Sequence, residues 1–451
     1  MVFSPIEDFE WKTDGWPWPP EGAWHYVGND TIVNIPHQLM KNGTLTDVIS
    51  YYFMFYQTNV EKVISTNSNI INMECMFEES NATSLDLSEL DTSNVTNMAG
   101  MFILAQATTL NLNNFDTSNV TNMEAMFYGV EATVLDLSSF DMSGVTETGW
   151  MFDHAAAATL GWARTQADVD ILNATSGKPE TLTFRHLKKV WTPEDLDNVR
   201  NDLEGHYVQM ADIDLGGSWA EGEGWQPIGG PTWGERFKGS YDGNGFKISG
   251  LTINRLTDSY VGLFGMVNVW PKIMDFELKN ITIQHADIKG DQAIAGVCVS
   301  SLSASAKNIK IINSNVIGTN QTGGAFGLAN STIVNCSVIN SEIFSSGEND
   351  WSRFGGVVGH LDGSIFNSFS INTNITANTS NNNTIGGICG YSQAFIENCY
   401  SQNGTLSIEN GIAIGGLVGI SDFTYGDIFN CYASNIISGS AVYMGGLVGF
   451  L

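Results

Sequence analysis

Apolar residues recur at a fixed step of 25 positions in the first half of the chain. The segment 91–102, DTSNVTNMAGMF, returns as 116–127, DTSNVTNMEAMF, and as 141–152, DMSGVTETGWMF. Pairs of leucines in the pattern L-x-L precede these segments, at 85/87, 110/112 and 135/137. Apolar residues at fixed positions of a fixed period predict a solenoid, because each coil then buries its core against the next. The L-x-L pairs predict one short strand in each coil.

The consensus of this repeat, LDLSxFDTSNVTNMxxMF, places an asparagine (Asn94, Asn119) where its side chain can bond the backbone of the turn that follows the strand. These residues resemble the BspA-like leucine-rich repeats of bacterial surface proteins, which also occur in phage tail proteins. The resemblance covers about residues 31–184. It implies a stack of leucine-rich-repeat coils and a role at a surface.

A glycine-rich motif recurs in the second half of the chain at a period near 30. It reads GGAFG at 323–327 and GGLVG at 415–419 and 445–449, with relatives at 355–359 and 386–390. Each period continues with I-x-N-C-Y or a relative, and then with a third apolar run. Three short strands per period, with Gly and Asn at the corners, predict the coils of a parallel β-helix. The segments before the motif resemble the start of the GLUG-type repeats of large bacterial surface proteins.

The predicted fold class is therefore mostly β, with two solenoids in one chain of 451 residues. A leucine-rich-repeat coil stack is expected over residues 31–186, followed by a GLUG-type parallel β-helix over residues 187–451. Residues 1–30, which are rich in Trp and Pro, are expected to be an N-terminal cap or a docking segment.

Two short helices are expected where one solenoid gives way to the other. Thr165 is a good N-cap for a helix at 167–173, which would close the first solenoid. Thr192, followed by Pro193, is a good N-cap for an amphipathic helix at 192–203. The boundary between the two solenoids is expected between these helices.

Four tryptophans in the N-terminal region, Trp11, Trp16, Trp18 and Trp24, are taken as candidate ligand-binding residues. The prolines among them exclude regular helix and favour an extended or turn-rich segment. One interpretation is a cap over the open edge of the first coil, which is favoured because every solenoid end must be covered. The other is an aromatic platform for a sugar, or a docking peptide for a larger assembly.

The repeat also places aspartates in one column, at Asp91, Asp116 and Asp141. Stacked coils lie about 4.8 Å apart, so neighbouring carboxylates repel each other by roughly 1 kcal/mol in water. Each aspartate can offset this by accepting hydrogen bonds from its own Thr-Ser-Asn turn. A bound cation such as calcium is the alternative, but the turn is sufficient by itself. The methionines of the same repeat are expected to be core.

The formal net charge is −29, and only five Lys or Arg precede residue 180. Such a surface repels nucleic acid and anionic membranes, so both are excluded as partners. No apolar run approaches about 18 residues, so no membrane insertion is expected. The six cysteines lack CxxC pairs and nearby histidine sets, which argues against zinc. They are expected to be free thiols, and Cys298 and Cys389 stand where other coils place Val or Phe.

Parallel β-helices also host polysaccharide-degrading enzymes, whose sites need converging carboxylates. The densest group of candidates is Asp212, Asp214, Glu235, Arg236 and Asp242. The first two belong to the pattern DIDL and the last to the turn signal YDGNG, so a folding role is expected. No serine–histidine–aspartate set, phosphate loop or metal motif is found in the sequence. We therefore predict no catalytic residue, no cofactor and no metal site.

The predicted function is non-catalytic attachment to a surface, since solenoids offer long rigid faces to glycans or proteins. The N-terminus lacks the basic region and apolar run of a signal peptide, and no C-terminal anchor is visible. This favours a phage tail fibre or a tail-associated host-binding component of the virion. A bacterial cell-surface adhesin, a β-helix polysaccharide depolymerase and a purely structural spacer are the alternatives.

The expected partner is a glycan of the cell envelope or a surface protein of a host. Other tail proteins or further copies of the chain are the candidates for assembly. The chain stops at Leu451, directly after a glycine motif and without the rest of that coil. A bare end of this kind exposes strand edges and apolar residues such as Phe450. We therefore expect the native protein to continue past Leu451, or to dock this edge onto another chain.

Overall fold

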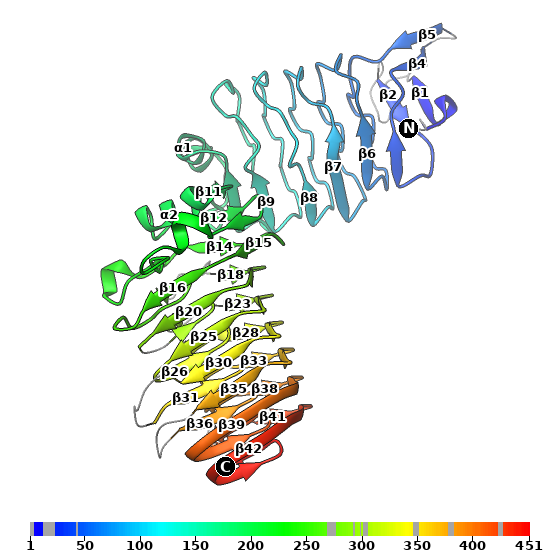
Figure 1. The fold of residues 1–451 in the computed structure, drawn as a ribbon. Coiled ribbons are helices and arrows are strands. Elements are labelled where there is room, and N and C mark those ends of the chain that lie inside the picture. Colours follow the sequence, from blue (N-terminus) through cyan, green and yellow to red (C-terminus); the bar gives the residue numbers. More distant parts are fainter. Residues whose placement is uncertain are drawn as a thin grey trace. The chain divides into compact units, whose positions relative to one another are not determined.

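The computed structural model describes residues 4–11, 23–41, 44–267, 277–291, 294–297, 299–300, 305–345, 351–377, 383–422 and 427–451. The chain divides into two compact units, Met1–Leu187 and Lys188–Leu451. Strand dominates both units, and the strands of successive coils pair in parallel, as Figure 1 shows. The predicted fold class, mostly β with parallel solenoids, is confirmed.

The first unit begins with short elements that precede the regular coils. The 3-10 helix η1 (Ile6–Asp8) leads into β1 (Phe9–Trp11), which pairs antiparallel with β2 (Trp24–Tyr26). A second antiparallel hairpin joins β4 (Gln38–Lys41) to β5 (Thr44–Asp47). Both hairpins come before the first full coil in the chain.

One parallel strand per coil follows, as the L-x-L pairs predict. The leucines that point inward from these strands, such as Leu85 and Leu135, are buried, while the residues between them face outward. The strands pair in parallel in the order β3 (Ile32–Asn34), β6 (Lys62–Ser65), β7 (Ser84–Leu90) and β8 (Thr109–Asn111), and again in the order β9 (Val134–Leu137), β10 (Leu160–Ala163) and β11 (Thr183–Val190).

Columns of methionine and phenylalanine fill the interior of the first unit. Phenylalanine rings of successive coils stack nearly parallel from Phe55 to Phe152, with centroids 5.3, 5.8, 5.5 and 5.7 Å apart. The repeat methionines are fully buried, which confirms that they are core: Met98, Met101, Met123, Met126 and Met151. Each coil therefore depends on its neighbours for its apolar contacts.

Side chains at both ends of this core cover it. Tyr26 of β2 donates its N–H to the carbonyl of Met54 at 2.9 Å, and its ring contacts Phe55. At the other end lies α1 (Gln166–Ala174), whose N-cap Thr165 accepts from the backbone N–H of the third helical residue. The predicted capping helix is confirmed. That residues 1–30 serve as a cap or a docking segment stays a prediction.

The second unit opens with α2 (Pro193–Asp197) and the 3-10 helix η2 (Asn198–Asn201). Thr192 is the N-cap, as predicted, and Asp195 completes a capping box. The α-helix is shorter than the expected 192–203, because the buried residues Leu196 and Val199 are three apart, a spacing that suits a 3-10 turn. None of the helices in the described ranges has the length and hydropathy needed to cross a bilayer.

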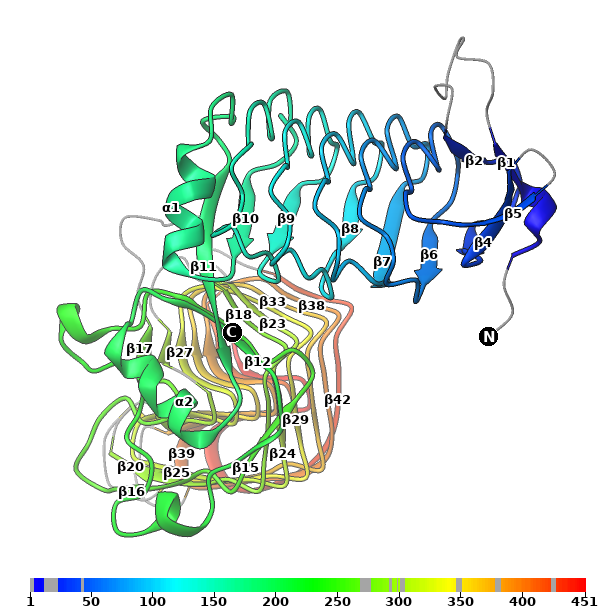
Figure 2. The same ribbon diagram turned by 90° about the horizontal axis from the view of Figure 1, so that it is seen from above.

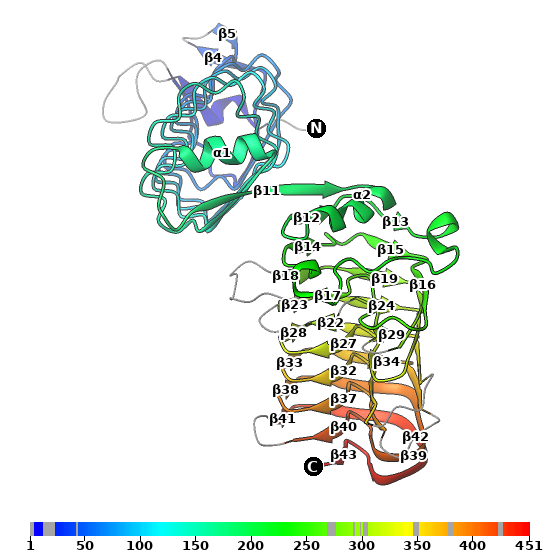
Figure 3. The same ribbon diagram turned by 90° about the vertical axis from the view of Figure 1, so that its left-hand side faces the viewer.

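The coils of the second unit lie one on the next, and Figure 2 looks along this stack. Figure 3 shows the parallel sheets that run down its sides. One sheet contains β12 (His206–Gln209), β14 (Ser240–Asp242), β18 (Glu277–Lys279), β23 (Ser305–Lys307), β28 (Thr332–Val334), β33 (Ile365–Phe366), β38 (Ile396–Glu397) and β41 (Ile428–Phe429). A second contains β27 (Phe326–Ala329), β32 (Val358–Leu361), β37 (Cys389–Ser392), β40 (Val418–Ser421) and β43 (Val448–Phe450).

The third and largest sheet takes the remaining strands of each coil. It contains β13 (Ile213–Asp214), β15 (Lys247–Ser249), β16 (Thr252–Arg255), β19 (Thr282–Gln284), β20 (Asp287–Gly290), β21 (Ile294–Ala295), β24 (Lys310–Ile312), β25 (Asn315–Gly318), β26 (Gln321–Gly323), β29 (Ser337–Ile339), β30 (Glu342–Ser345), β31 (Arg353–Gly355), β34 (Phe369–Ile371), β35 (Asn374–Ala377), β36 (Thr384–Gly386), β39 (Tyr400–Gly415) and β42 (Tyr432–Gly445). Two 3-10 helices, η3 (Gly217–Ala220) and η4 (Trp233–Glu235), and the pair β17 (Met266–Val267) and β22 (Val299–Ser300) complete the unit.

A full coil such as β27 to β31 has five strands rather than the three predicted. Asn335 and Asn340, with φ of 55° and 51°, separate β28 from β29 and β29 from β30. Left-handed backbone interrupts a strand, and asparagine tolerates it better than most residues. The prediction placed asparagine at the corners but counted I-x-N-C-Y as one strand, although its asparagine divides it into two.

Asparagines at one of these corners form an amide ladder. Asn430 donates its side-chain N–H to Asn398 at 2.6 Å, and Asn398 donates to Asn367 at 3.1 Å. Asn335 likewise donates to Asn308 of the preceding coil at 3.2 Å. The ladder therefore ties the corners of successive coils together.

The cysteines of the described residues are free thiols: Cys75, Cys336, Cys389, Cys399 and Cys431. Cys298 lies outside the described residues. Cys389 is fully buried and pairs in register with Val358 and Val418, which confirms that it behaves as a small hydrophobe.

The last coil, formed by β42 and β43, exposes apolar side chains. Ile436, Val442 and Phe450 are exposed to 68%, 71% and 40% of their surface. That this edge is covered in the native protein stays a prediction.

Candidate ligand-binding site

A hollow of about 280 Å³ in the first unit contains two of the four candidate tryptophans. Residues of both N-terminal hairpins and of the start of the first coil surround it. Its lining consists of Trp11, Ala23, Trp24, Lys41, Thr46, Asp47, Ile49, Ser50 and Tyr52. The other two candidates, Trp16 and Trp18, lie outside the described residues.

The two tryptophans have different roles. They face each other in the β1–β2 register, with ring centroids 5.1 Å apart and planes at 70°. Trp24 is buried in the core of the unit, so its ring is fixed. Trp11 is half-buried, and the ammonium of Lys41 lies 3.9 Å from the centroid of its ring. This cation–π contact holds Lys41 beside the hollow.

The polar groups of the hollow come mainly from the second hairpin and the first coil. Gln38 donates to Oδ1 of Asp47 at 2.6 Å across the β4–β5 register, which fixes that carboxylate. Tyr52 lies against Phe53 edge to face, with centroids 4.7 Å apart. Burial, followed by the nearby carboxylate of Glu74, raises the pKa of Tyr52, so its hydroxyl stays protonated at neutral pH. The hydroxyl can therefore both donate and accept a hydrogen bond.

This arrangement suits binding of a small polar molecule with an apolar face. Binding sites for small molecules combine aromatic and apolar walls with a few fixed polar groups, and here these are one ammonium, one carboxylate and hydroxyls. A sugar ring has both kinds of surface. Asp47 is the one carboxylate among the described lining residues, whereas glycoside hydrolysis uses a pair of carboxylates.

The sequence analysis missed Lys41, Asp47 and Tyr52. They lie before the regular repeat, where no periodicity assigns them to a position. One local signal was available, because Asn42-Gly43 stands between short runs that alternate apolar and polar residues. This dipeptide is a strong signal for a two-residue hairpin turn, and it would have placed residues 38–47 in a hairpin.

A second hollow of about 360 Å³ lies on the same unit and is more polar. It is lined by two backbone stretches, 25–30 and 56–60, and includes Tyr26 and Tyr56. Burial, followed by a hydrogen bond to Glu79, raises the pKa of Tyr56 to about 12. With few apolar walls, this hollow offers a ligand less contact than the hollow beside Trp11.

The aspartates of the candidate catalytic group accept hydrogen bonds from the backbone. Asp214 accepts from the N–H of Gly216 at 3.0 Å and Asp242 from the N–H of Asn244 at 2.8 Å, each in its own turn. Asp212 accepts from the N–H of Lys247 of a later coil at 2.8 Å. That these aspartates have a folding role stays a prediction. Glu235, at the end of η4, is exposed, and Arg236 is half-buried. Across the ranges that the structure describes, no group of three or more His, Cys, Asp or Glu could hold a metal ion.

The aspartate column of the first unit is explained by its turns, as expected. Oδ1 of Asp91, Asp116 and Asp141 accepts from the N–H of the serine two residues on, at 3.0, 3.0 and 2.9 Å. The asparagines of the same turns differ from the prediction, because Asn94 and Asn119 donate to carbonyls of the preceding coil at 2.9 and 2.8 Å. They join coils rather than close their own turns.

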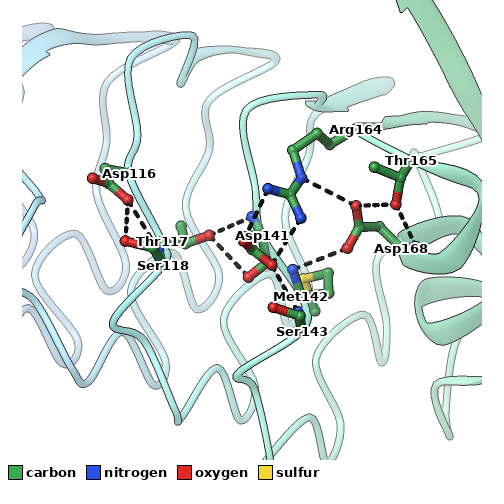
Figure 4. A network of polar contacts seen from close by, with 9 residues as sticks. All are labelled: Asp116, Thr117, Ser118, Asp141, Met142, Ser143, Arg164, Thr165 and Asp168. Atoms are coloured by element: carbon green, nitrogen blue, oxygen red, sulfur yellow. Dashed lines mark hydrogen bonds and ion pairs between the residues drawn. The ribbon is translucent and has the colours of Figure 1, made fainter.

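An arginine that the sequence did not single out ends this column. Figure 4 shows Arg164 between two carboxylates, with Nη2 2.8 Å from Oδ1 of Asp141 and Nε 3.3 Å from Oδ2 of Asp168. Hydrogen bonds from Ser143, and then Arg164, lower the pKa of Asp141. Arg164 thus offsets, at Asp141, the repulsion between the carboxylates of this column.

Two stretches of the chain match known families. Residues 49–161, which contain the 25-residue repeats, match the family described as "Mycoplasma protein of unknown function, DUF285". Residues 410–438, in the second unit, match "The GLUG motif". The GLUG resemblance is confirmed at those residues, and the leucine-rich-repeat type of the first unit stays a prediction.

Two relatives match over less than a third of the chain. A protein of Evansella cellulosilytica, named as a Gly-rich membrane protein, is 32% identical over 149 residues, which are 32% of this chain and 16% of that protein. Halomucin of Haloquadratum walsbyi is 33% identical over 137 residues, which are 29% of this chain and 1% of that protein. The matches thus span a small part of the length of these relatives.

Two solved structures match parts of this chain at low sequence identity and with TM-scores below 0.5. One, from Bacteroides ovatus and named as an immunoglobulin A1 protease, has 20% identity and a TM-score of 0.43 over 61% of this chain and 85% of that chain. The other, named IgA1 Protease, has 18% identity and a TM-score of 0.40 over 58% of this chain and 20% of that chain. Similarity at this level concerns the fold and says nothing about activity.

Proposed function

We propose that this chain is a non-catalytic attachment protein, displayed at a surface, that binds its target through the hollow beside Trp11. The observation that carries this proposal is the lining of the hollow, where the rings of Trp11, Trp24 and Tyr52 stand beside Lys41 and Asp47. The relative named as a membrane protein supports a surface location. The stacked coils supply a rigid support for such a site.

The proposed target is a glycan of a cell envelope. Aromatic walls bind the apolar face of a sugar ring, while one ammonium, one carboxylate and hydroxyls bind its hydroxyl groups. A surface protein of a host is the second candidate, since tryptophan, tyrosine and charged residues are also typical of protein interfaces. A glycan is favoured because the hollow is small and enclosed by two hairpins.

The proposed location has two versions. A phage tail fibre or tail-associated host-binding component is the prediction from the sequence. A cell-surface adhesin is favoured by the relatives, which come from the cellular organisms Evansella cellulosilytica and Haloquadratum walsbyi. Labelled antibody against this chain distinguishes the two, because it decorates either purified virions or whole cells.

The test of the proposed site is binding of envelope glycans by wild type and by Trp11→Ala. We expect Trp11→Ala to weaken binding at least about tenfold, which corresponds to about 1.4 kcal/mol. The matched control is Trp150→Ala, because Trp150 is in the same unit, is 59% exposed and does not line the hollow.

The assignment of the hollow would be contradicted if both variants lost affinity equally, or if neither variant lost affinity. New reducing ends during incubation with wall polysaccharide would contradict a purely non-catalytic function and support the depolymerase alternative. A melting curve of each variant shows whether lost binding reflects lost folding.

A further inference from the structure

The glycine motif brings two outward-facing columns of side chains together along the second unit. In each coil, the strand before the motif and the strand after it meet at the first glycine. A Cβ atom on Gly355 would lie 1.8 Å from the carbonyl oxygen of Val358, so only glycine allows this approach. The same holds for Gly386 and the carbonyl of Cys389, at 2.0 Å. We call the outer surface of the second unit along these first glycines the glycine seam.

Contacts between the two columns show that they converge at the seam. One column contains Gln321, Arg353 and Thr384, in parallel register on β26, β31 and β36. The other contains His360 and Tyr391, in register on β32 and β37. Figure 3 shows these two strands one below the other. The guanidinium of Arg353 lies 4.3 Å from the centroid of the Tyr391 ring, and it also donates to His360.

Polar contacts define the state of each group in this cluster. A guanidinium only donates, so the imidazole of His360 accepts from Arg353. Nε2 of His360 contacts Oδ1 of Asp362 at 2.8 Å. Gln321 contacts the same imidazole at 3.3 Å, and Gln393 donates to the hydroxyl of Tyr391 at 2.6 Å.

Arg353 therefore keeps its positive charge without a direct carboxylate partner. Within the described parts of the chain, no carboxylate lies within 4.0 Å of its guanidinium nitrogens, and Asp362 acts on it through the imidazole of His360 and at longer range. A guanidinium has five N–H donors in a planar fork that matches a carboxylate. Burial lowers the pKa of Arg353, as expected for a cation partly removed from water. An anion would recover what burial costs this group.

Other groups at the cluster suit a sugar. Trp351, two residues before Arg353, is 60% exposed and has a φ of 69°. A bulky residue in the left-handed region is uncommon, and such strain persists where the surroundings hold it. The side-chain amides of Gln321 and Gln393 can bond hydroxyl groups.

We propose that the Arg353 cluster, made of Gln321, Arg353, His360, Asp362, Tyr391 and Gln393, is a binding site for the carboxylate of an acidic sugar. The guanidinium fork takes the carboxylate, the imidazole fixed by Asp362 keeps the fork in place, and the two amides take neighbouring hydroxyls. This site lies in the second unit and is independent of the hollow beside Trp11.

The first measurement uses the wild-type chain in about 0.15 M salt, where the Debye length is about 8 Å and the general negative charge of the chain is screened. Phenylglyoxal modifies accessible arginines, and peptide mass mapping reports each one. We expect trigalacturonate to protect Arg353, and its methyl ester, which lacks the charge, to protect it at least tenfold less well. Arg255, which pairs with Glu223 at 2.8 Å, is the internal reference and should show no protection.

The second measurement is calorimetric titration of variants with the same trimer. Arg353→Gln should weaken binding at least tenfold, and Arg353→Lys, which keeps the charge and loses the fork, should weaken it several-fold. Arg255→Gln removes the same charge from the same unit and should bind as wild type.

Three results would overturn the proposal. One is absence of Arg353 protection in the wild type at millimolar trimer. Another is equal protection by the methyl ester or by inorganic phosphate, which would show that no sugar carboxylate is recognised. The third is equal affinity of Arg353→Gln and Arg255→Gln. If Arg353→Gln does not fold, the protection measurement on the wild type still decides.

Discussion

Substitution of Asp168 by asparagine tests the closure of the first unit. Asp168 is buried, with 2% of its surface exposed, and its carboxylate accepts three hydrogen bonds. The donors are the N–H of Met142 at 3.1 Å, the hydroxyl of Thr165 at 2.6 Å and Nε of Arg164 at 3.3 Å. One side chain thus joins the capping helix α1 to the last full repeat.

The expected loss follows from these contacts. Asparagine keeps one acceptor oxygen and presents an NH₂ group in place of the other, so the pair with Arg164 is lost while one backbone bond is kept. Hydrogen bonds to charged groups contribute about 1.5–3 kcal/mol each. Because the side chain of Arg164 is 39% exposed, water can replace part of its partner. We expect the free energy of unfolding of the first unit to fall by about 2–3 kcal/mol.

The assay is urea unfolding of the full chain, followed by hydrogen exchange of peptides from each unit. Peptides of α1 and of residues 141–152 should exchange at lower urea, while those of the second unit should not change. The matched control is Asp170→Asn, on the same helix but exposed, and it should shift stability by less than about 0.5 kcal/mol. A loss below that value in Asp168→Asn, or an equal loss in both variants, would refute the reasoning.

The remaining predictions concern binding, backbone approach and thiol chemistry. Trp11→Ala should weaken glycan binding at least about tenfold while Trp150→Ala does not, and Arg353→Gln should weaken trigalacturonate binding at least tenfold while Arg255→Gln does not. Gly386→Ala should lower the free energy of unfolding in a urea melt by more than about 3 kcal/mol or prevent folding, because its Cβ would lie 2.0 Å from a carbonyl oxygen. Gly446→Ala is the control and should be tolerated, because no atom lies within 4 Å of the added Cβ. A hydrogen bond from Cys399 lowers the pKa of Cys431, so iodoacetamide should alkylate Cys431 at a lower pH than an ordinary thiol, and Cys399→Ala should move the midpoint of this alkylation upward. An unchanged midpoint would contradict the hydrogen bond.

Elements with a strict period could be predicted from the sequence. The 25-residue step fixes which leucines, methionines and phenylalanines share a column, and a column of identical apolar residues has few ways to be buried other than by stacking. The same logic gave the turn role of Asp116, since an aspartate followed by Thr-Ser-Asn bonds its own backbone in any coil. N-caps such as Thr165 and Thr192 were recognisable because capping depends on a few neighbouring residues.

Features that depend on a single coil could not be predicted in this way. The number of strands per coil was wrong because I-x-N-C-Y was counted as one strand, although its asparagine, such as Asn335, has left-handed backbone and ends the strand. Arg164 was missed because its two partners lie 23 residues before it and four residues after it, and no pattern joins the three. The lining of the hollow beside Trp11 comes from two hairpins outside the period, so only the tryptophans attracted notice.

The departures from periodicity also show where function is to be sought in a solenoid. Residues that repeat in every coil are accounted for by stacking, as in the amide ladder of Asn398 and the buried column of Cys389. Arg353 breaks its column, because its neighbours in register are Gln321 and Thr384. Among the described residues, no carboxylate lies within 4.0 Å of this guanidinium, so its partial burial costs stability that a ligand would offset. Trp11 lies outside the 25-residue period, and its half-buried ring lines the hollow. Both residues therefore stand at positions that the repeat of the coils does not dictate.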